Sequence, residues 1–186
     1  MASTDNDLLE RIRAGDKRVF AQLVNRYKDR AMTLAVRVLR NREDAEEAVQ
    51  DSFVRAYNGL EKFEGNAKFS TWFYRIVYNV CLSRVSRRKD NFDSLDADGA
   101  FDLPDTQIQN PHQILEVKDL VAILKRTVES LPNKYSTIIS LFYFQEMSYE
   151  DICAITDLPL GTVKAHLFRA RALLQKQLAE QLPEVA

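Results

Sequence analysis

The sequence has only two cysteines, no apolar stretch of membrane-spanning length and almost no net charge. Cys81 and Cys153 are too few and too far apart for a recognisable zinc site. We therefore expect buried free thiols, with a redox role as the less favoured alternative. The chain also lacks a membrane span and the apolar core of a signal peptide, which predicts a cytoplasmic protein that is not inserted in a membrane.

Patterns that support catalysis are missing as well. The two histidines are isolated, no glycine-rich phosphate loop occurs, and no serine, histidine and acid cluster together. The carboxylates are concentrated at one helix start and in one linker, where paired acid and base roles are not expected. The sequence therefore predicts a protein that is not an enzyme and that needs no metal, cofactor or small-molecule substrate.

The charged residues that are present are segregated along the chain. A net charge of -1 means that any nucleic-acid surface must come from local clusters rather than from a globally basic protein. Residues 42–51 contain one base and five acids, whereas residues 68–89 contain six bases and no acid. We expect these two segments to meet different partners.

Hydrophobic periodicity predicts an all-α protein. Helices are expected at residues 7–14, 19–39, 43–57, 70–89, 111–131, 135–142, 149–156 and 162–178. Residues 90–110 contain six aspartates and no base, a composition typical of an extended linker. The prediction is two small helical domains, at residues 1–90 and 111–186, joined by a flexible acidic linker at residues 91–110. The second is a four-helix domain that ends in a helix-turn-helix.

The final helical pair begins with a predicted capping box, in which Ser148 and Asp151 satisfy free amides at the helix start. A turn follows at residues 157–161, and Thr162 is placed to cap the second helix. Earlier in the chain, Asp16 and Ser70 are placed to cap the helices that follow them. On that helix a stripe repeats at steps of three and four residues and should be core: Val163, Leu167, Ala170, Leu174 and Leu178. Lys164, Ala165, Phe168 and Arg169 lie outside this stripe, where they could read a DNA major groove. An ordinary solvated helical hairpin is the alternative.

The basic segment interleaves aromatic and cationic side chains. Trp72, Phe73 and Ile76 lie on one side of the predicted helix, which favours a role in the core. Arg75, Tyr78, Asn79, Ser83 and Arg84 face elsewhere, and Tyr74 lies at the edge. Aromatic rings stack on bases and amides read exposed base edges, so this face is suited to single-stranded nucleic acid.

The acidic segment has two explanations. Acids in the first turn of a helix compensate the helix dipole, which accounts for Asp44 and Glu47. Gln50 and Asp51 continue the polar face beyond that turn. A protein-docking surface explains these later residues better.

Three motifs occur in a fixed order: DAEEAVQDSFVRAY (44–57), FSTWFYRIVYN (69–79) and LPLGTVKAHLFRAR (158–171). Together they resemble the bacterial extracytoplasmic-function sigma factors, the small two-domain initiation subunits of RNA polymerase. The resemblance covers nearly the whole chain. It implies that the chain binds core polymerase, directs it to specific promoters and promotes DNA opening.

The resemblance also implies residue roles and partners. The polymerase partners are the clamp helices of the largest subunit and the flap of the second-largest subunit, and an anti-sigma protein is expected to inhibit the chain. Contacts to the clamp are implied for Asp44, Glu47, Gln50 and Asp51. Contacts to the minus-ten element are implied for Phe63, Asn66, Lys68, Tyr74, Arg75, Tyr78, Asn79, Ser83 and Arg84. Contacts to the minus-thirty-five element are implied for Pro159, Gly161, Thr162, Lys164, Ala165, Phe168 and Arg169.

Three residues of the reading helix depart from the family pattern. Many relatives have arginine, serine and arginine where this chain has Lys164, Ala165 and His166. Lysine lacks the bidentate fork of arginine and alanine has no donor, so base reading is expected to rely on Phe168, Arg169 and DNA shape.

Two other functions remain alternatives. A stand-alone DNA-binding regulator would use the terminal helix-turn-helix, but it leaves the basic aromatic segment unexplained. A small helical enzyme is disfavoured by the missing catalytic patterns.

Overall fold

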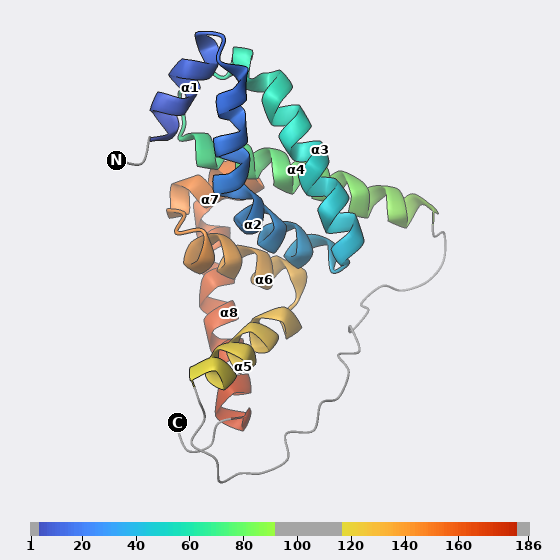
Figure 1. Cartoon of the computed structure of the whole chain (residues 1–186). Coiled ribbons are helices and arrows are strands. Elements are labelled where there is room, and N and C mark those ends of the chain that lie inside the picture. The colour runs from blue at the N-terminus through green and yellow to red at the C-terminus, as the bar shows by residue number, and fades with distance from the viewer. Residues whose placement is uncertain (1–3, 92–116, 182–186) are drawn as a thin grey trace.

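The computed structural model describes residues 4–91 and 117–181, and every regular element in these ranges is helical (Figure 1). We call residues 4–91 the first module and residues 117–181 the second module. The first contains α1 (Asp5–Arg13), η1 (Lys17–Val19), α2 (Phe20–Leu39), α3 (Arg42–Gly59), η2 (Leu60–Lys62) and α4 (Phe69–Asn91). The second contains α5 (Val117–Ser130), α6 (Asn133–Ile139), η3 (Ser140–Phe144), α7 (Tyr149–Thr156) and α8 (Leu160–Gln181). The predicted all-α fold with two helical regions is confirmed.

Two sequence predictions fall outside the described residues. The linker predicted at residues 91–110 is one, apart from Asn91, which ends α4. The helix start predicted at residues 110–111 is the other, since the description of α5 begins at Val117.

Side-chain caps set several helix starts. Ser148 and Asp151 form the predicted capping box of α7, and Thr4 and Asp7 form another at α1. Asn41 begins α3 by accepting a hydrogen bond from the amide of Asp44. Each cap satisfies an amide that has no partner within its helix.

Three predicted caps differ from the structure. Asp16 precedes a 3-10 turn rather than an α-helix, and its side chain makes no cap bond and instead pairs with Arg11 at 2.8 Å. Ser70 lies inside α4 rather than before it, because the helix already begins at Phe69. Thr162 lies inside α8: its amide donates to the Pro159 carbonyl, so the helix starts two residues earlier than predicted.

Packing of α2, α3 and α4 forms the centre of the first module. Phe73 is fully buried and stacks with Phe53 at 4.6 Å and with Phe69 at 5.9 Å between ring centroids. Trp72 is half-buried and packs against Phe63. The expectation that Trp72 and Phe73 serve mainly in packing is confirmed.

The second module packs α8 against α6 and α7. Val163, Leu167 and Ala170 are buried, whereas Leu174 and Leu178 are half-buried. The predicted apolar stripe therefore holds, and it is most deeply buried in the first half of α8. The opposite side of this first half of α8 can therefore contact partners outside the second module.

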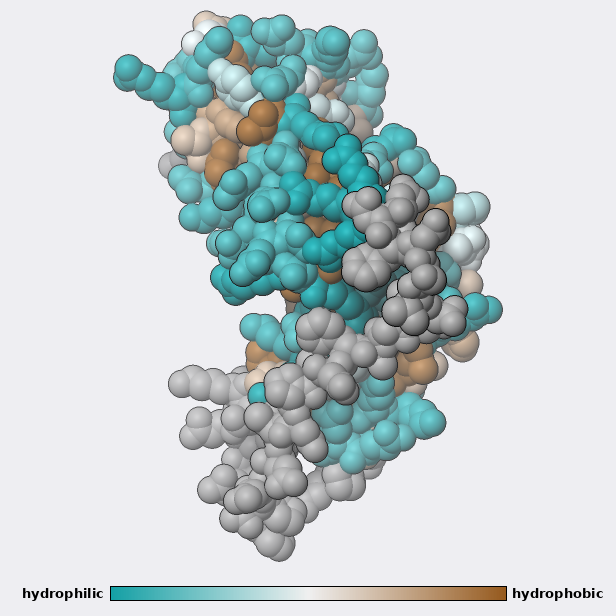
Figure 2. All heavy atoms as spheres, turned by 90° about the vertical axis from the view of Figure 1, so that its right-hand side faces the viewer, coloured by the Kyte–Doolittle hydropathy of each residue, from teal (hydrophilic) through white to brown (hydrophobic). Residues whose placement is uncertain are grey.

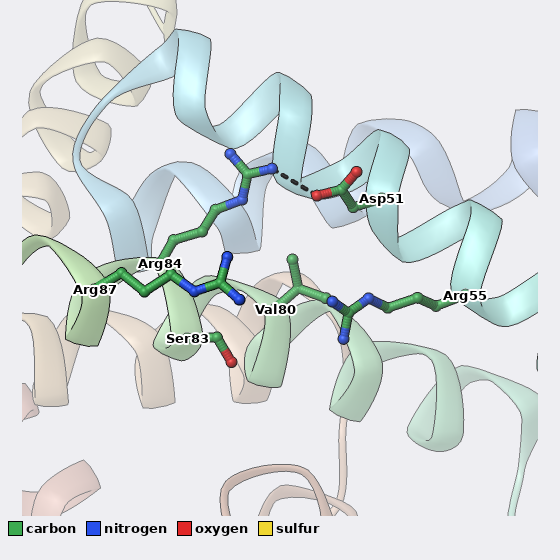
Figure 3. Close-up of a pocket in the computed structure, with 6 residues that line it drawn as sticks. All are labelled: Asp51, Arg55, Val80, Ser83, Arg84 and Arg87. Carbon is green, nitrogen blue, oxygen red and sulfur yellow. Dashed lines mark hydrogen bonds and ion pairs between the residues drawn. The ribbon is translucent and has the colours of Figure 1, made fainter.

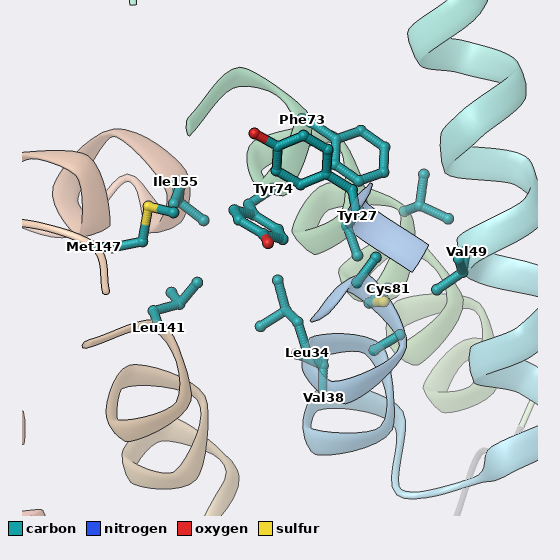
Figure 4. Close-up of a cluster of buried hydrophobic side chains, with 14 of the residues drawn as sticks. Tyr27, Leu34, Val38, Val49, Phe73, Tyr74, Cys81, Leu141, Met147 and Ile155 are labelled. Atoms are coloured by element: carbon teal, nitrogen blue, oxygen red, sulfur yellow. The ribbon is translucent and has the colours of Figure 1, made fainter. Parts of the chain in front are cut away.

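The two modules are packed together rather than separate. Helix α4 lies against α7, and α2 lies against α6. Tyr74 sits at this junction and is completely buried, so its predicted position at the edge of the apolar side is wrong. Figure 4 shows second-module side chains on one side of Tyr74 and first-module aromatics on the other: Leu141, Met147 and Ile155 against Tyr27 and Phe73.

Candidate polymerase and nucleic-acid interface

The outward face of α8 is exposed in the structure. Phe168 has 74% of its surface accessible, which is unusual for an aromatic side chain in the described chain. Lys164 and Arg169 are exposed beside it, and Ala165 is half-buried. These residues share the first three turns of the second helix of the pair, the part of a helix-turn-helix that enters a major groove.

The turn before α8 fixes the angle between the two helices. Asp157 ends α7 in a left-handed conformation, with φ of 57°. The Pro159 carbonyl then accepts hydrogen bonds from Thr162 and Val163 at 2.9 and 3.0 Å. Pro159 and Gly161 are exposed and Thr162 is half-buried. All seven residues predicted for the minus-thirty-five element therefore lie in one continuous segment.

Two basic side chains on α8 pack against aromatic rings. Lys164 lies 5.7 Å from the ring centroid of Tyr149. Arg171 stacks on Phe142 and Tyr143, and its Nε donates to the Tyr143 hydroxyl at 2.8 Å. Within the described residues Arg169 packs against no aromatic ring, so its guanidinium is more available to DNA than that of Arg171.

His166 is half-buried at the edge of this face. Burial lowers its pKa below the ordinary range, and the nearby charges of Lys134 and Arg169 act in the same direction. Its Nδ1 is buried without a hydrogen-bond partner, and its ring meets Tyr135 edge to face at 5.5 Å. The imidazole is therefore held in its neutral form more strongly than in an unfolded chain.

The loop predicted to contact the minus-ten element is partly anchored in the core. Phe63 is buried, and its carbonyl accepts a hydrogen bond from Arg13. Asn66 and Lys68 are exposed, and the Asn66 amide donates to Glu64 at 2.9 Å. Gly65 has φ of 80°, a conformation that favours glycine and turns the loop sharply.

The polar side chains of α4 form a row at intervals of four residues. Arg75, Asn79 and Ser83 are exposed in this row, and the Ser83 hydroxyl donates to the Asn79 carbonyl at 2.8 Å. Tyr78 is half-buried beside them; burial raises the pKa of its phenol, and the charge of Asp157 adds to this effect. Tyr74 lies apart from the row in the core, where burial also raises its pKa.

Three side chains, from the first half of α4 and the residue just before it, contact acids of the second module. Arg75 pairs with Asp157 at 2.8 Å, and Lys68 lies 3.4 Å from Asp151. The Thr71 hydroxyl donates to Asp151 at 2.7 Å. Burial raises the pKa of Asp151, but hydrogen bonds from Thr71 and Ser148 and the charge of Lys68 outweigh it and lower the pKa overall. Thr71 carries no pattern in the sequence that would have singled it out.

The acidic face of α3 is also paired within the chain. Arg84 contacts Glu47 at 2.9 Å and Asp51 at 2.6 Å, and Arg88 pairs with Asp44. Gln50 is exposed. The two segments of opposite charge therefore meet each other, although the sequence predicted separate partners for them.

A groove of about 420 Å³ runs between α3 and α4 beyond these ion pairs. Figure 3 shows its lining: Asp51, Arg55, Val80, Ser83, Arg84 and Arg87. The side of the molecule on the right of Figure 1, where α3 and the end of α4 lie, is shown in Figure 2, and its described surface is mostly hydrophilic. Arg55 continues the polar face of α3 beyond Gln50 and Asp51, and Arg87 is one of the six bases of residues 68–89, but the family resemblance assigned neither a role. The available signal was the spacing of Arg87, four residues after Ser83.

The same residues bear on metal binding, membrane insertion and thiol chemistry. Residues 4–91 and 117–181 contain no group of three or more acids, histidines and cysteines arranged to hold a metal ion. No helix in these ranges is both long and apolar enough to cross a membrane. Cys81 is a buried free thiol, and burial raises its pKa to about 12. Cys153 is a free, half-buried thiol.

Comparison with known proteins identifies the family. Residues 23–91 match sigma-70 region 2, and residues 122–174 match sigma-70 region 4. The chain is 36% identical to the ECF RNA polymerase sigma-E factor of Haemophilus influenzae, over 94% of this chain and 95% of that protein. It is 35% identical to the ECF RNA polymerase sigma factor SigW of Bacillus subtilis, over 92% and 95% of the two chains.

A solved structure has a similar fold. It contains the sigma factor RpoE of Bartonella quintana in complex with the anti-sigma factor NepR. The TM-score is 0.65 at 23% sequence identity, covering 86% of this chain and 96% of that chain. The two matched regions and the near full-length relatives lead to one conclusion: this chain belongs to the extracytoplasmic-function sigma factors, non-enzymatic subunits with which RNA polymerase recognises promoters and initiates transcription.

Proposed function

We propose that this sigma factor uses three separate surfaces, one for polymerase and two for promoter DNA. The surface on α3 binds the clamp helices of the largest polymerase subunit through Asp44, Glu47, Gln50 and Asp51. The surface on α4 and its preceding loop binds the opened minus-ten element. The surface on α8 binds the minus-thirty-five duplex, and the second module also contacts the flap of the second-largest subunit.

The face of α8 is the observation that carries this proposal. Phe168 is 74% exposed while Leu167, its neighbour in sequence, is 1% exposed. An exposed aromatic costs solubility, and its position between Lys164 and Arg169 fits a thymine methyl flanked by phosphates. The rest of this surface consists of small side chains, which allow close approach to the duplex: Pro159, Gly161, Thr162 and Ala165.

The minus-ten surface is proposed to act on single-stranded DNA. The loop at residues 63–68 holds a base flipped out of the non-template strand, and Arg75, Tyr78 and Asn79 contact the neighbouring nucleotides. Ser83 and Arg84 continue the contact along α4. Flipping a base costs a few kcal/mol, so a protein that binds the flipped base stabilises the opened promoter.

Phe63 and Tyr74 differ from the other proposed minus-ten residues because both are buried. Phe63 anchors the loop to the core by packing against Trp72. Tyr74 reaches DNA only if the second module moves away from α4. The exposed residues Asn66, Lys68, Arg75 and Asn79 therefore carry most of the proposed contact.

An anti-sigma protein is the proposed inhibitor, since a fold relative is bound to one. A cytoplasmic location follows from the proposed polymerase partner. The proposed domain limits are residues 1–90 and 111–186, with the linker at residues 91–110.

In vitro transcription with core polymerase over a library of genomic promoters tests the proposal. We expect the purified chain to select a small promoter set only when core enzyme is present. Asn79→Ala should reduce minus-ten selectivity or promoter opening, whereas Asn58→Ala, an exposed asparagine at the end of α3, serves as the control. Tight site-specific duplex binding by the chain alone would instead support a stand-alone regulator.

A further inference from the structure

We propose that the groove between α3 and α4 binds the phosphodiester backbone of promoter DNA through Arg55 and Arg87. This inference rests on the proposed function, which brings DNA to the neighbouring face of α4. It adds a residue of α3, Arg55, to a DNA surface that was otherwise confined to α4 and its loop. The groove would hold the strand by charge and would not read its sequence.

The charges around the groove are not balanced. Arg84 turns away to Asp51 and Glu47, and these two acids compensate it. No salt bridge joins Arg55 or Arg87 to an acid in residues 4–91 or 117–181. Figure 3 shows the guanidinium groups of Arg55 and Arg87 directed into the groove from opposite sides, with Val80 between them. Two converging like charges favour an anion between them.

The shape of the groove suits a phosphate. Val80 is 3% exposed and forms the apolar base of the groove, which limits access of water from the protein interior. Ser83 lies at the rim with its hydroxyl already donating to the Asn79 carbonyl, and two arginines supply planar donors that match phosphate oxygens. Exposed arginines from two different helices give the anion a fixed position rather than a single mobile contact.

Continuity with α4 selects a DNA strand over a free anion. Arg75, Asn79, Ser83 and Arg87 are spaced by four residues and are all exposed, so they form a row that winds slowly around the helix. At 1.5 Å per residue the row is about 18 Å long. At an axial spacing of about 3.4 Å per nucleotide, that length corresponds to about five nucleotides of one stacked strand. A strand that contacts Arg75 and Asn79 is therefore led into the groove.

Salt dependence of holoenzyme binding tests this site. The promoter chosen by the wild-type holoenzyme in the transcription library serves as the probe, together with a single-base variant of its minus-ten element. Arg55→Gln and Arg87→Gln should each lower the slope of log affinity against log salt by about one. Affinity should fall by a similar factor on both DNAs, because backbone contacts carry no sequence information. Arg18→Gln removes an exposed arginine that does not line the groove and is the matched control.

The outcomes separate this inference from the proposed function. If wild-type holoenzyme selects no promoter, the proposed function fails. If wild type binds but both variants keep its affinity and salt slope, the groove inference is wrong. If Arg55→Gln weakens assembly with core polymerase and leaves the slope unchanged, the occupant is a polymerase carboxylate and the inference is also wrong. Competition by inorganic phosphate with no change in slope would assign the site to a free anion.

The contact between the modules carries a second, independent inference. We infer that the free chain adopts a closed state in which the second module masks the minus-ten surface. Lys68 and Arg75, both expected to contact DNA, are held instead by Asp151 and Asp157. These carboxylates occupy the charge positions that phosphates would take. Thr71 strengthens the contact by donating to Asp151.

Polar bonds surround the buried apolar contact around Tyr74 at the junction. Arg37 pairs with Glu129 at 3.3 Å, and Asn133 donates to the Val38 carbonyl at 3.2 Å. Arg40 also donates to Asn133. Each bond can be replaced by water or by another partner when the modules separate.

The double variant Thr71→Val/Asp157→Asn tests the closed state without polymerase. Valine keeps the shape of Thr71, and asparagine tolerates the left-handed conformation at position 157, so the fold is retained. We expect the double variant to have a larger radius of gyration in small-angle scattering. It should bind fluorescent single-stranded DNA of the non-template minus-ten sequence about fivefold or more tightly than wild type.

Asp16→Asn removes an exposed ion pair far from the junction and should change neither property. Wild-type and double-variant chains with equal radii would show that the contact does not hold the modules together. A larger radius without tighter DNA binding would show that the second module does not mask the surface. Either result overturns the closed-state inference and leaves the polymerase-dependent function intact.

Discussion

The hydroxyl of Tyr74 donates a 2.9 Å hydrogen bond to Oε1 of Gln145, a residue of the other module. Gln145 is 2% exposed, and its amide nitrogen donates to the Arg30 carbonyl at 3.2 Å. One glutamine of the second module therefore satisfies two polar groups of the first. Because both side chains are buried, the bond can be exchanged for water only when the modules separate.

Tyr74→Phe should lower the free energy of unfolding by about 1–3 kcal/mol, because it leaves the buried Oε1 of Gln145 without a donor. Urea unfolding followed by circular dichroism measures the change. Tyr143→Phe is the matched control, since it removes an exposed hydroxyl that only accepts from Arg171, and should cost less than about 0.5 kcal/mol. Equal effects of the two substitutions would contradict a structural role for the Tyr74 bond.

Local patterns predicted much of this architecture. The spacing of Val163, Leu167 and Ala170 identified the buried side of α8, because helical periodicity and burial are set by the same geometry. Ser148 and Asp151 identified the start of α7 because a capping box needs only neighbouring residues. The exposure of Phe168 followed from its position opposite the buried stripe.

Contacts between distant residues could not be predicted in the same way. Periodicity placed Tyr74 at a helix edge because it describes a single helix and gives no information on contacts with Gln145, which is 71 residues away. The acids Glu47 and Asp51 were separated from Arg84 for the same reason, since α3 and α4 pair only after folding. Thr162 was wrongly placed as a cap because Pro159 provides the first carbonyl of α8 instead.

A charge swap between Asp51 and Arg84 can separate the internal and external roles of the acidic face. Asp51→Arg should weaken binding to core polymerase about tenfold or more if Asp51 faces the clamp. The double variant Asp51→Arg/Arg84→Asp rebuilds an ion pair of reversed direction between α3 and α4. We expect it to recover only part of the stability lost in the single variant, which is at most about 1 kcal/mol for an exposed pair, because the acid at position 84 then faces Glu47. Polymerase binding should not recover.

Competition against labelled wild-type chain for core enzyme measures the affinity, and thermal unfolding measures stability. Recovery of both properties in the double variant would mean that Asp51 acts only within the chain. Glu10→Arg, which reverses an exposed acid on α1, controls for the change in net charge.

Phe168→Ala should separate DNA binding from folding. With 74% of its surface exposed, Phe168 contributes little to the core, and its removal should change the free energy of unfolding by less than about 0.5 kcal/mol. Loss of an apolar contact with the duplex should reduce transcription about tenfold from promoters that depend on the minus-thirty-five element. Leu173→Ala removes another exposed apolar side chain of α8 outside the proposed surface, and should leave transcription unchanged.

His166 should make stability depend on pH near neutrality. Burial and the charges of Lys134 and Arg169 lower its pKa in the folded chain below the value near 6.5 of an unfolded chain. Between these two pKa values the unfolded chain binds more protons, so stability rises with pH in that window and is lost as pH falls through it. His166→Gln removes this contribution, and subtracting its unfolding curves from those of wild type cancels the effect of Asp151 and other titrating groups. We expect the difference in free energy of unfolding to favour wild type increasingly from pH 5 to pH 7. Curves that remain parallel over this range would show that His166 titrates alike in both states.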